Sequence, residues 1–378
     1  MSERIEDRLG ALTDKGVIII DPRQTYVAPE VNPDRIFAGC TLHPGTRLTG
    51  SRTLVGSCAQ IGTEGPAVIH DTMIGSHAEV ASGFLTESTL LPRAKAGANS
   101  HFRAGTLLEE EASTAHSVGL KQSILMYSVT LGSLINLCEV LVSGGRSRSE
   151  HTEIGSGFIH FNFTPWGKNG DKATPSLIGN VTDGVFLDQE RIFLGGLSGI
   201  VGPNTVGFGA MTVAGQVVRK PVSGSTMHAE LGREFDRPFS PSEGNFSGSH
   251  LARIRSMNLE FISQLRALKV WYSEIRLKRS QLQKDAELSL VLIGAIETIQ
   301  NCLDERFKRY NSFAAEWSLP LVDPQCLNDI DSMSPVFSLN WNLNAEYDKW
   351  VFGLAEGEKQ ELHHWLSDHA ARLKRALL

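Results

Sequence analysis

Aliphatic residues return at every sixth position through the middle of the chain. Between the two regular runs, aliphatic-glycine pairs mark further repeats. A period of six is neither the helical period nor the alternation of a simple strand. It fits a parallel β-helix, in which each flat face of a three-sided coil contributes one inward residue and stacked coils bury the core together. The alternative is a β-sandwich with chance spacing. The first run is Ile36, Leu42, Leu48 and Leu54, the pairs are Ile61-Gly62, Ile74-Gly75, Leu131-Gly132, Ile154-Gly155 and Ile178-Gly179, and the last run is Leu194, Ile200, Val206, Thr212 and Val218.

This pattern predicts a mainly β fold, a left-handed parallel β-helix of hexapeptide repeats, followed by an α-helical C-terminal module. We expect a helix/strand leader at 1–20, the β-helix at 21–221, a linker rich in Ser, Gly and Pro at 222–248, and the α-helical module at 249–378. Two stretches disturb the repeat, 92–130 and 163–177. The second contains Pro, Gly and Lys and predicts a loop that leaves the β-helix, a common carrier of functional residues.

Apolar residues three and four apart predict the helical module. One stripe continues to an apolar patch at 288–299, and a second amphipathic helix is expected over 346–377. The module could pack on itself or on the β-helix, or form a coiled coil between protomers. The first stripe comprises Leu251, Ile254, Asn258, Phe261, Leu265, Leu268, Tyr272 and Ile275.

Composition narrows the class of protein. The net charge of -6 argues against a general nucleic-acid binder. Five scattered cysteines without a CxxC pair suggest neither a disulfide framework nor a zinc knuckle, so we expect a cytoplasmic protein. The charged N-terminus has no signal-peptide core, and no apolar run is long enough to suggest a membrane protein.

The stretch IGSGFIHFNFTPWG, which begins at Ile154, carries the most specific family motif. The hexads, this motif and VGFGAMTVAGQVV near the end of the repeats resemble the hexapeptide-repeat acyltransferases. Within that group they resemble the acetyltransferase domain of bifunctional N-acetylglucosamine-1-phosphate uridyltransferase, over about 200 residues. No Gly-rich nucleotide-binding loop precedes them, so nucleotidyl transfer is not expected from this chain.

The resemblance implies a set of substrate-binding residues. The family's sugar-phosphate arginine falls on Arg103, a lysine one coil further on falls on Lys121, the sugar-binding asparagine falls on Asn162, and a loop lysine falls near Lys172. Cationic side chains suit a phosphate, and an amide suits sugar hydroxyls. The run Gly145-Arg146-Ser147-Arg148 could add charge beside this site or form a solvated turn.

The family's general base is replaced in this chain. Its histidine position holds Asn136, and the tyrosine that follows is Glu139. An amide does not accept a proton at neutral pH. His151 and His160 are the nearest candidate bases, with Glu139 as a further option, and we expect His160 to point to the same face as Asn162 because the two share strand parity.

An acyl-CoA, by the same resemblance, would lie along the last coils. Ala210 and Ala214 would leave room for the cofactor on that surface because their side chains are small. Arg219 and Lys220 would bind the cofactor's phosphates. A second hexad family, the γ-type carbonic anhydrases, binds metal through three histidines, but the spacing of His70, His77, His101 and His116 lacks the family's close pair, so no metal is expected.

These residues give a leading function and an alternative. The leading hypothesis is an acyltransferase that uses acetyl-CoA or another acyl-CoA to modify an amino sugar, sugar phosphate or nucleotide sugar. The alternative is a non-catalytic module that binds a sugar phosphate or nucleotide sugar, or a scaffold, with the C-terminal helices recruiting a partner protein. The resemblance also implies a homotrimer with sites between neighbouring β-helices.

Overall fold

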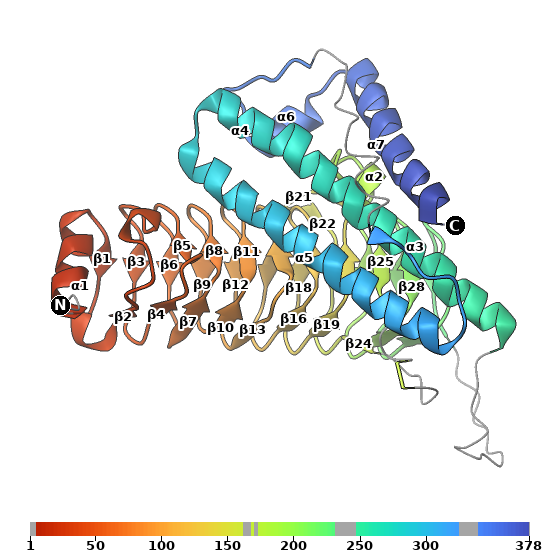
Figure 1. The fold of residues 1–378 in the computed structure, drawn as a ribbon, viewed down its shortest axis with the longest axis horizontal. Coiled ribbons are helices and arrows are strands. Elements are labelled where there is room, and N and C mark those ends of the chain that lie inside the picture. The colour runs from red at the N-terminus through yellow and green to blue at the C-terminus, as the bar shows by residue number, and fades with distance from the viewer. Residues whose placement is uncertain (1–4, 162–167, 170–172, 231–246, 325–338, 378) are drawn as a thin grey trace.

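The structure is a computed structural model that describes residues 5–161, 168–169, 173–230, 247–324 and 339–377. Within these residues, three parallel sheets form the sides of a long prism, which confirms the predicted β-helix (Figure 1). We call them sheets A, B and C in the order in which each coil visits them, and they hold eleven, ten and eight strands. The helix α1 (Ile5–Asp14) lies at the N-terminal end of the prism.

The strands are short, because each face of a coil is only a few residues wide. Sheet A contains β1 (Ile18–Ile19), β3 (Thr41–Leu42), β6 (Gln60–Ile61), β9 (Glu79–Val80), β12 (Lys95–Ala96), β15 (Ser113–Thr114), β18 (Thr130–Leu131), β23 (Glu153–Ile154), β26 (Phe193–Leu194), β29 (Met211–Thr212) and β31 (Met227–His228). Sheet B contains β2 (Tyr26–Val27), β4 (Arg47–Thr49), β7 (Ala67–His70), β10 (Gly83–Thr86), β13 (Ser100–Phe102), β16 (Gly119–Lys121), β19 (Asn136–Cys138), β24 (Ile159–Phe161), β27 (Gly199–Val201) and β30 (Val217–Val218). Sheet C contains β5 (Leu54–Val55), β8 (Met73–Ile74), β11 (Ser88–Leu90), β14 (Thr106–Leu108), β17 (Ile124–Leu125), β20 (Val140–Val142), β25 (Ser176–Ile178) and β28 (Asn204–Val206).

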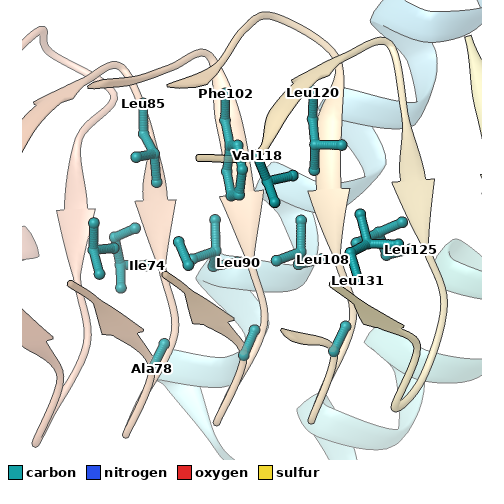
Figure 2. Packing of buried hydrophobic residues seen from close by; sticks show 14 of the residues in the cluster. Ile74, Ala78, Leu85, Leu90, Phe102, Leu108, Val118, Leu120, Leu125 and Leu131 are labelled. Atoms are coloured by element: carbon teal, nitrogen blue, oxygen red, sulfur yellow. The ribbon is translucent and has the colours of Figure 1, made fainter. Parts of the chain in front are cut away.

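The inward side chains stack directly on their counterparts in the next coil. In sheet C, Ile74, Leu90, Leu108 and Leu125 form one such column, and Figure 2 shows it facing the sheet B column that contains Phe102. All of these side chains have zero exposed fraction. Since one coil buries little apolar surface alone, the stacking provides most of the stability of the prism.

The last hexads keep the predicted register, whereas an early one slips. Leu194, Ile200 and Val206 are buried in the prism core on sheets A, B and C in turn. Leu54, by contrast, is on the outer side of sheet C, and its neighbour Val55 is the inward residue. The pairing of β31 with β29 extends sheet A to His228, into the stretch that we expected to be a linker.

The helical module covers the outer side of sheet C (Figure 1). It contains α3 (Gly248–Trp271), a π-helical segment (Tyr272–Leu277), α4 (Lys278–Gln283), α5 (Ala286–Glu316), α6 (Tyr347–Phe352) and α7 (Glu356–Leu377). Two sequence expectations were wrong here. The first stripe does not continue into the apolar patch at 288–299, because the chain reverses at Lys284, which has a left-handed φ of 58°, and Asp285 caps a separate helix, α5. Residues 346–377 form two helices instead of one, and the first of them ends at Phe352.

Helix α5 crosses sheet C diagonally through small side chains (Figure 1). A Cβ built on Gly294 would lie 1.8 Å from the sulfur of Met73, so the helix backbone approaches β8 closely. One turn later, Thr298 and Thr89 hydroxyls are 2.9 Å apart, and the Cys302 thiol then donates to the Gly105 carbonyl at 3.1 Å. Helix α5 is long and apolar enough to cross a membrane by length and composition, and 44% of its most apolar window is buried against the rest of the protein.

Candidate functional site

Two cations are stacked on the outer side of sheet B. Phe102 pairs with Leu120 in the core, so the next residues, Arg103 and Lys121, stand in one outward column on adjacent coils. Neighbouring strands lie about 4.8 Å apart. Arg103 is exposed and Lys121 half-buried, and neither side chain has a hydrogen bond or ion pair within the described part of the chain. Two free cations at this spacing can bind an anionic group together.

Asn136 is close to these cations. In the next column of the same face, Asn136 pairs with Gly119, which is on the same strand as Lys121. The side chain of Asn136 is exposed. The structure therefore brings Arg103, Lys121 and Asn136 together on sheet B, and we call these three residues the sheet B row.

Cys138 is the next residue in the Arg103–Lys121 column, because it pairs with Lys121. Burial raises the pKa of its thiol, as does the nearby charge of Glu139, while Arg309, Lys121 and Arg103 act in the opposite direction. Helix α5 thus brings a further cation, Arg309, toward the edge of the row.

Glu139 faces α5 instead of the outer side of sheet B. It lies at the corner between sheets B and C with a left-handed φ of 62°, and only 4% of it is exposed. Its carboxylate forms ion pairs with Arg306 and Arg309. We considered Glu139 as a substrate-binding residue or base, but two guanidinium groups already bind its carboxylate.

His160 points into the prism core, and the expectation that it shares a face with Asn162 is not tested because Asn162 lies outside the described residues. His160 pairs with Ile200 in the inward column of sheet B and is 5% exposed. Its Nε2 lies 2.9 Å from the Ser176 hydroxyl. Burial lowers the pKa of His160 to about 4, because a charged imidazole loses its hydration there. A buried histidine behind the sheet is poorly placed to take a proton from a substrate outside it.

His151 lies at another corner of the prism. It belongs to a hairpin of β21 (Gly145–Ser147) and β22 (Glu150–His151), inserted between sheets C and A. Its Nδ1 is 2.8 Å from the Arg148 carbonyl. Within one chain, His151 is therefore separate from the sheet B row.

The basic run in this hairpin is largely engaged in structural contacts. Arg148 donates to the carbonyl oxygens of Glu111 and Ser128 and to the hydroxyl of Thr130, which lie on two preceding coils. Arg146 donates to the Asp188 carbonyl. The guanidinium of Arg148 thus joins adjacent coils.

Asn162 and Lys172 lie outside the described residues. Described parts of the same loop contact the helical module. The backbone N–H groups of Lys168 and Asn169 donate to the Glu316 carboxylate of α5, and the amide of Asn258 on α3 donates to the Ala173 carbonyl at 3.1 Å.

The residues considered for acyl-CoA are dispersed. Ala210 is 1% exposed and belongs to the prism core, so the expectation that it lies on the outer surface and leaves room for the cofactor was wrong. Ala214 is exposed at the corner between sheets A and B, whereas Arg219 follows β30 and forms an ion pair with Glu230 at 3.2 Å. Lys220 is exposed beside Arg219.

The four histidines considered for a metal are on different parts of the prism. His70 and His101 are on sheet B, and His77 and His116 are at two different corners. Within the described ranges, no group of three His, Cys, Asp or Glu side chains could hold a metal ion.

Similar proteins identify the repeat region. The chain is 30% identical to the bifunctional protein GlmU of Mycobacterium leprae over 207 residues, which is 55% of this chain and 37% of that protein. It is 25% identical to the bifunctional protein GlmU of Halalkalibacterium halodurans over 240 residues, 63% of this chain and 46% of that protein. The chain is a GlmU-related hexapeptide-repeat protein. No protein-family model matches it.

This GlmU-related chain spans less than half the length of the GlmU proteins that it matches. The activity of those whole proteins is therefore not transferred to it directly.

Sequence reasoning also missed the involvement of α5. Arg306 and Arg309 are spaced as one face of a helix, but their partner Glu139 is far away in the sequence, and no local pattern links them.

Proposed function

We propose that this protein is a hexapeptide-repeat acyltransferase that acts on an amino sugar, a sugar phosphate or a nucleotide sugar with an acyl-CoA as donor. The observation that carries the proposal is the pair of cations Arg103 and Lys121, which have no partner among the described residues and are stacked on adjacent coils with Asn136 beside them. The cations would bind the phosphate and the amide a sugar hydroxyl. The similarity to GlmU proteins supports the reaction class.

The sheet B row lies on an open face of a single chain, so a second chain would complete the site. We propose a homotrimer, in which the ligand is held between neighbouring β-helices. Exposed apolar residues near the corner of sheets A and B support this contact: Leu134, Ile159 and Leu197 are 62%, 45% and 82% exposed. In such an assembly His151 of one chain would be the alternative to a base from the row's own chain, because its hairpin lies at another corner of the prism.

Arg219 and Lys220 remain our candidates for the cofactor's phosphates, together with exposed Ala214. Arg219 would have to exchange Glu230 for a phosphate, which is feasible because the arginine side chain is 62% exposed and ion pairs of partly exposed side chains are weak. Four described cysteines are free, which agrees with a cytoplasmic location.

Purified protein with acetyl-CoA and a panel of hexosamine phosphates and nucleotide sugars tests the proposal through thiol release. The expected result is acceptor-dependent release that Arg103→Ala reduces at least tenfold. Ligand-induced thermal stabilisation without thiol release by any acceptor would instead indicate the non-catalytic binding module. The absence of both thiol release and thermal stabilisation would contradict the acyltransferase and the binding module alike.

A further inference from the structure

One side-chain position in the sheet B face is open, beside the cations of the row. The outward column that contains Asn136 runs through Phe84, His101, Gly119, Asn136 and Ile159. Gly119 has no side chain, so a gap of one residue separates His101 from Asn136. A Cβ built on Gly119 would meet only Asn136 within 4 Å, at 3.6 Å from its Oδ1.

His101 is at one end of this gap and is available to a ligand. The imidazole is exposed, and its one described side-chain contact is an edge-on packing against Phe84, with ring centroids 5.8 Å apart. No hydrogen bond or ion pair to its ring occurs within the described residues. Phe84 thus supports the ring while leaving its nitrogens unoccupied.

His101 is on β13, and Arg103 directly follows this strand on the same outward face. Two residues along a strand span about 7 Å, and two coils span about 10 Å. A ligand whose phosphate lies on Arg103 and Lys121 could therefore place a neighbouring group over Gly119, between His101 and Asn136. These distances match the size of one sugar ring with its substituents.

We propose that His101 is the catalytic base of this protein and that Gly119 provides the space for the acceptor group. The inference rests on the proposed function and gives the proton acceptor that Asn136 does not supply. Histidine is suited to accept a proton near neutral pH.

The step balances without a further reactant. The nitrogen or oxygen of the acceptor attacks the thioester carbonyl carbon of the acyl-CoA, and the new bond forms to that carbon. His101 takes the proton from the attacking atom. The carbon–sulfur bond breaks, the CoA thiolate leaves with the bonding pair, and it takes up the proton, which returns His101 to its neutral form.

The first test compares His101→Gln with His77→Gln, a control at an exposed corner far from sheet B. With the acceptor found in the panel, H101Q should lower kcat at least 100-fold and change KM less than threefold. H101Q should also remove the limb of the pH–rate profile that reports the base. H77Q should leave kcat, KM and the pH–rate profile unchanged. A rate for H101Q within threefold of wild type would overturn the inference and leave the transferase proposal standing.

The second test fills the gap. Gly119→Val adds a β-branched side chain that suits a strand, at a position without a left-handed φ. We expect an unchanged melting temperature and at least a tenfold loss of sugar-phosphate affinity. Unaltered affinity and rate in G119V would overturn the role of the gap.

A third measurement does not depend on turnover. The ring carbon signals of the histidines, assigned with H101Q and H77Q, can be followed by NMR as glucosamine 1-phosphate is added to the intact protein. The His101 signal should move and the His77 signal should stay. If His101 moves but no acceptor is ever acylated, the placement is supported and the transfer step is overturned; an unmoved His101 in the ligand-saturated protein overturns the placement itself.

Discussion

Arg306 of α5 contacts the carboxylate of Glu139 at 2.5 Å, and both side chains are almost completely buried. The pair joins the C-terminal half of α5 to the corner between sheets B and C. Replacing Glu139 removes the countercharge that Arg306 and Arg309 share, so E139Q should lower the free energy of unfolding by about 3–5 kcal/mol. R306M leaves Glu139 paired with Arg309 and should cost less than E139Q. Urea unfolding measures this.

A matched control is available on the same helix. The pair of Arg309 with Glu305 is more exposed, so E305Q should cost less than about 1 kcal/mol. If E139Q is as mild as E305Q, the buried pair does not hold the module to the prism.

Gly294 permits the close approach of α5 to sheet C. Gly294→Ala would place a methyl group against Met73, which is 5% exposed and confined under the helix. We expect a loss of about 1–3 kcal/mol from overpacking. Gly10→Ala in α1 is the control, because nothing lies within 4 Å of its Cβ position, and it should raise stability by up to about 1 kcal/mol. Equal effects of the two changes on thermal unfolding would contradict this role.

His160 predicts a pH dependence of stability. Its pKa is about 4 in the folded protein, below the ordinary value of 6.5, so between these values the unfolded chain binds a proton that the folded chain does not. Above pH 6.5 the neutral His160 costs the folded protein nothing. As the pH falls toward 4, protonation of the unfolded chain lowers the free energy of unfolding by about 3 kcal/mol. His160→Leu, which matches Leu137 in the same column, should flatten this part of the curve. An unchanged slope in denaturant titrations across this interval would contradict the assignment.

Arg103 and Lys121 should matter for ligand binding and not for folding. Since neither side chain has a partner in the described structure, R103A and K121A should leave the melting temperature within about 1 °C and weaken a phosphate-bearing ligand about 10- to 100-fold, corresponding to a lost charge-assisted contact. Calorimetric titration with glucosamine 1-phosphate measures this. Lys95→Ala on sheet A, where the lysine is near Glu79, should bind like wild type.

Leu197 tests the proposed assembly. A charge on this 82% exposed residue should disrupt an apolar contact between copies, so L197E should elute as a monomer while wild type elutes as a trimer in light-scattering chromatography. Leu321→Glu changes another exposed leucine, beyond the end of α5, and should not affect assembly. A monomeric wild type would contradict the trimer.

The sequence predicts the prism well because its inward residues are local signals. Leu194, Ile200 and Val206 keep six-residue spacing, and each occupies a core position on successive sheets. Leu54 shows the limit of the pattern: it fits the same spacing but packs under the helices, since a spacing rule does not distinguish two buried sides of one sheet.

The site was less predictable, because its residues depend on contacts between distant segments. Arg103, Lys121 and Asn136 are on adjacent coils, where the repeat itself brings them together. The environment of Glu139 depends on α5, far along the chain, and the inward direction of His160 depends on the exact strand register. Neither follows from residue type or spacing.

The diagonal path of α5 has a consequence for how this architecture can change in length. The helix contacts three successive coils at a fixed spacing, through Gly294 with Met73, Thr298 with Thr89, and Cys302 with Gly105. Adding or removing a coil under the helix would shift every later contact away from its partner on α5. Coils that α5 does not contact are free of this constraint. Because α5 also contacts Arg52 and Ser57 at one end and Asn169 at the other, growth and loss of repeats in relatives that share this helix should occur outside the stretch from Arg52 to Asn169.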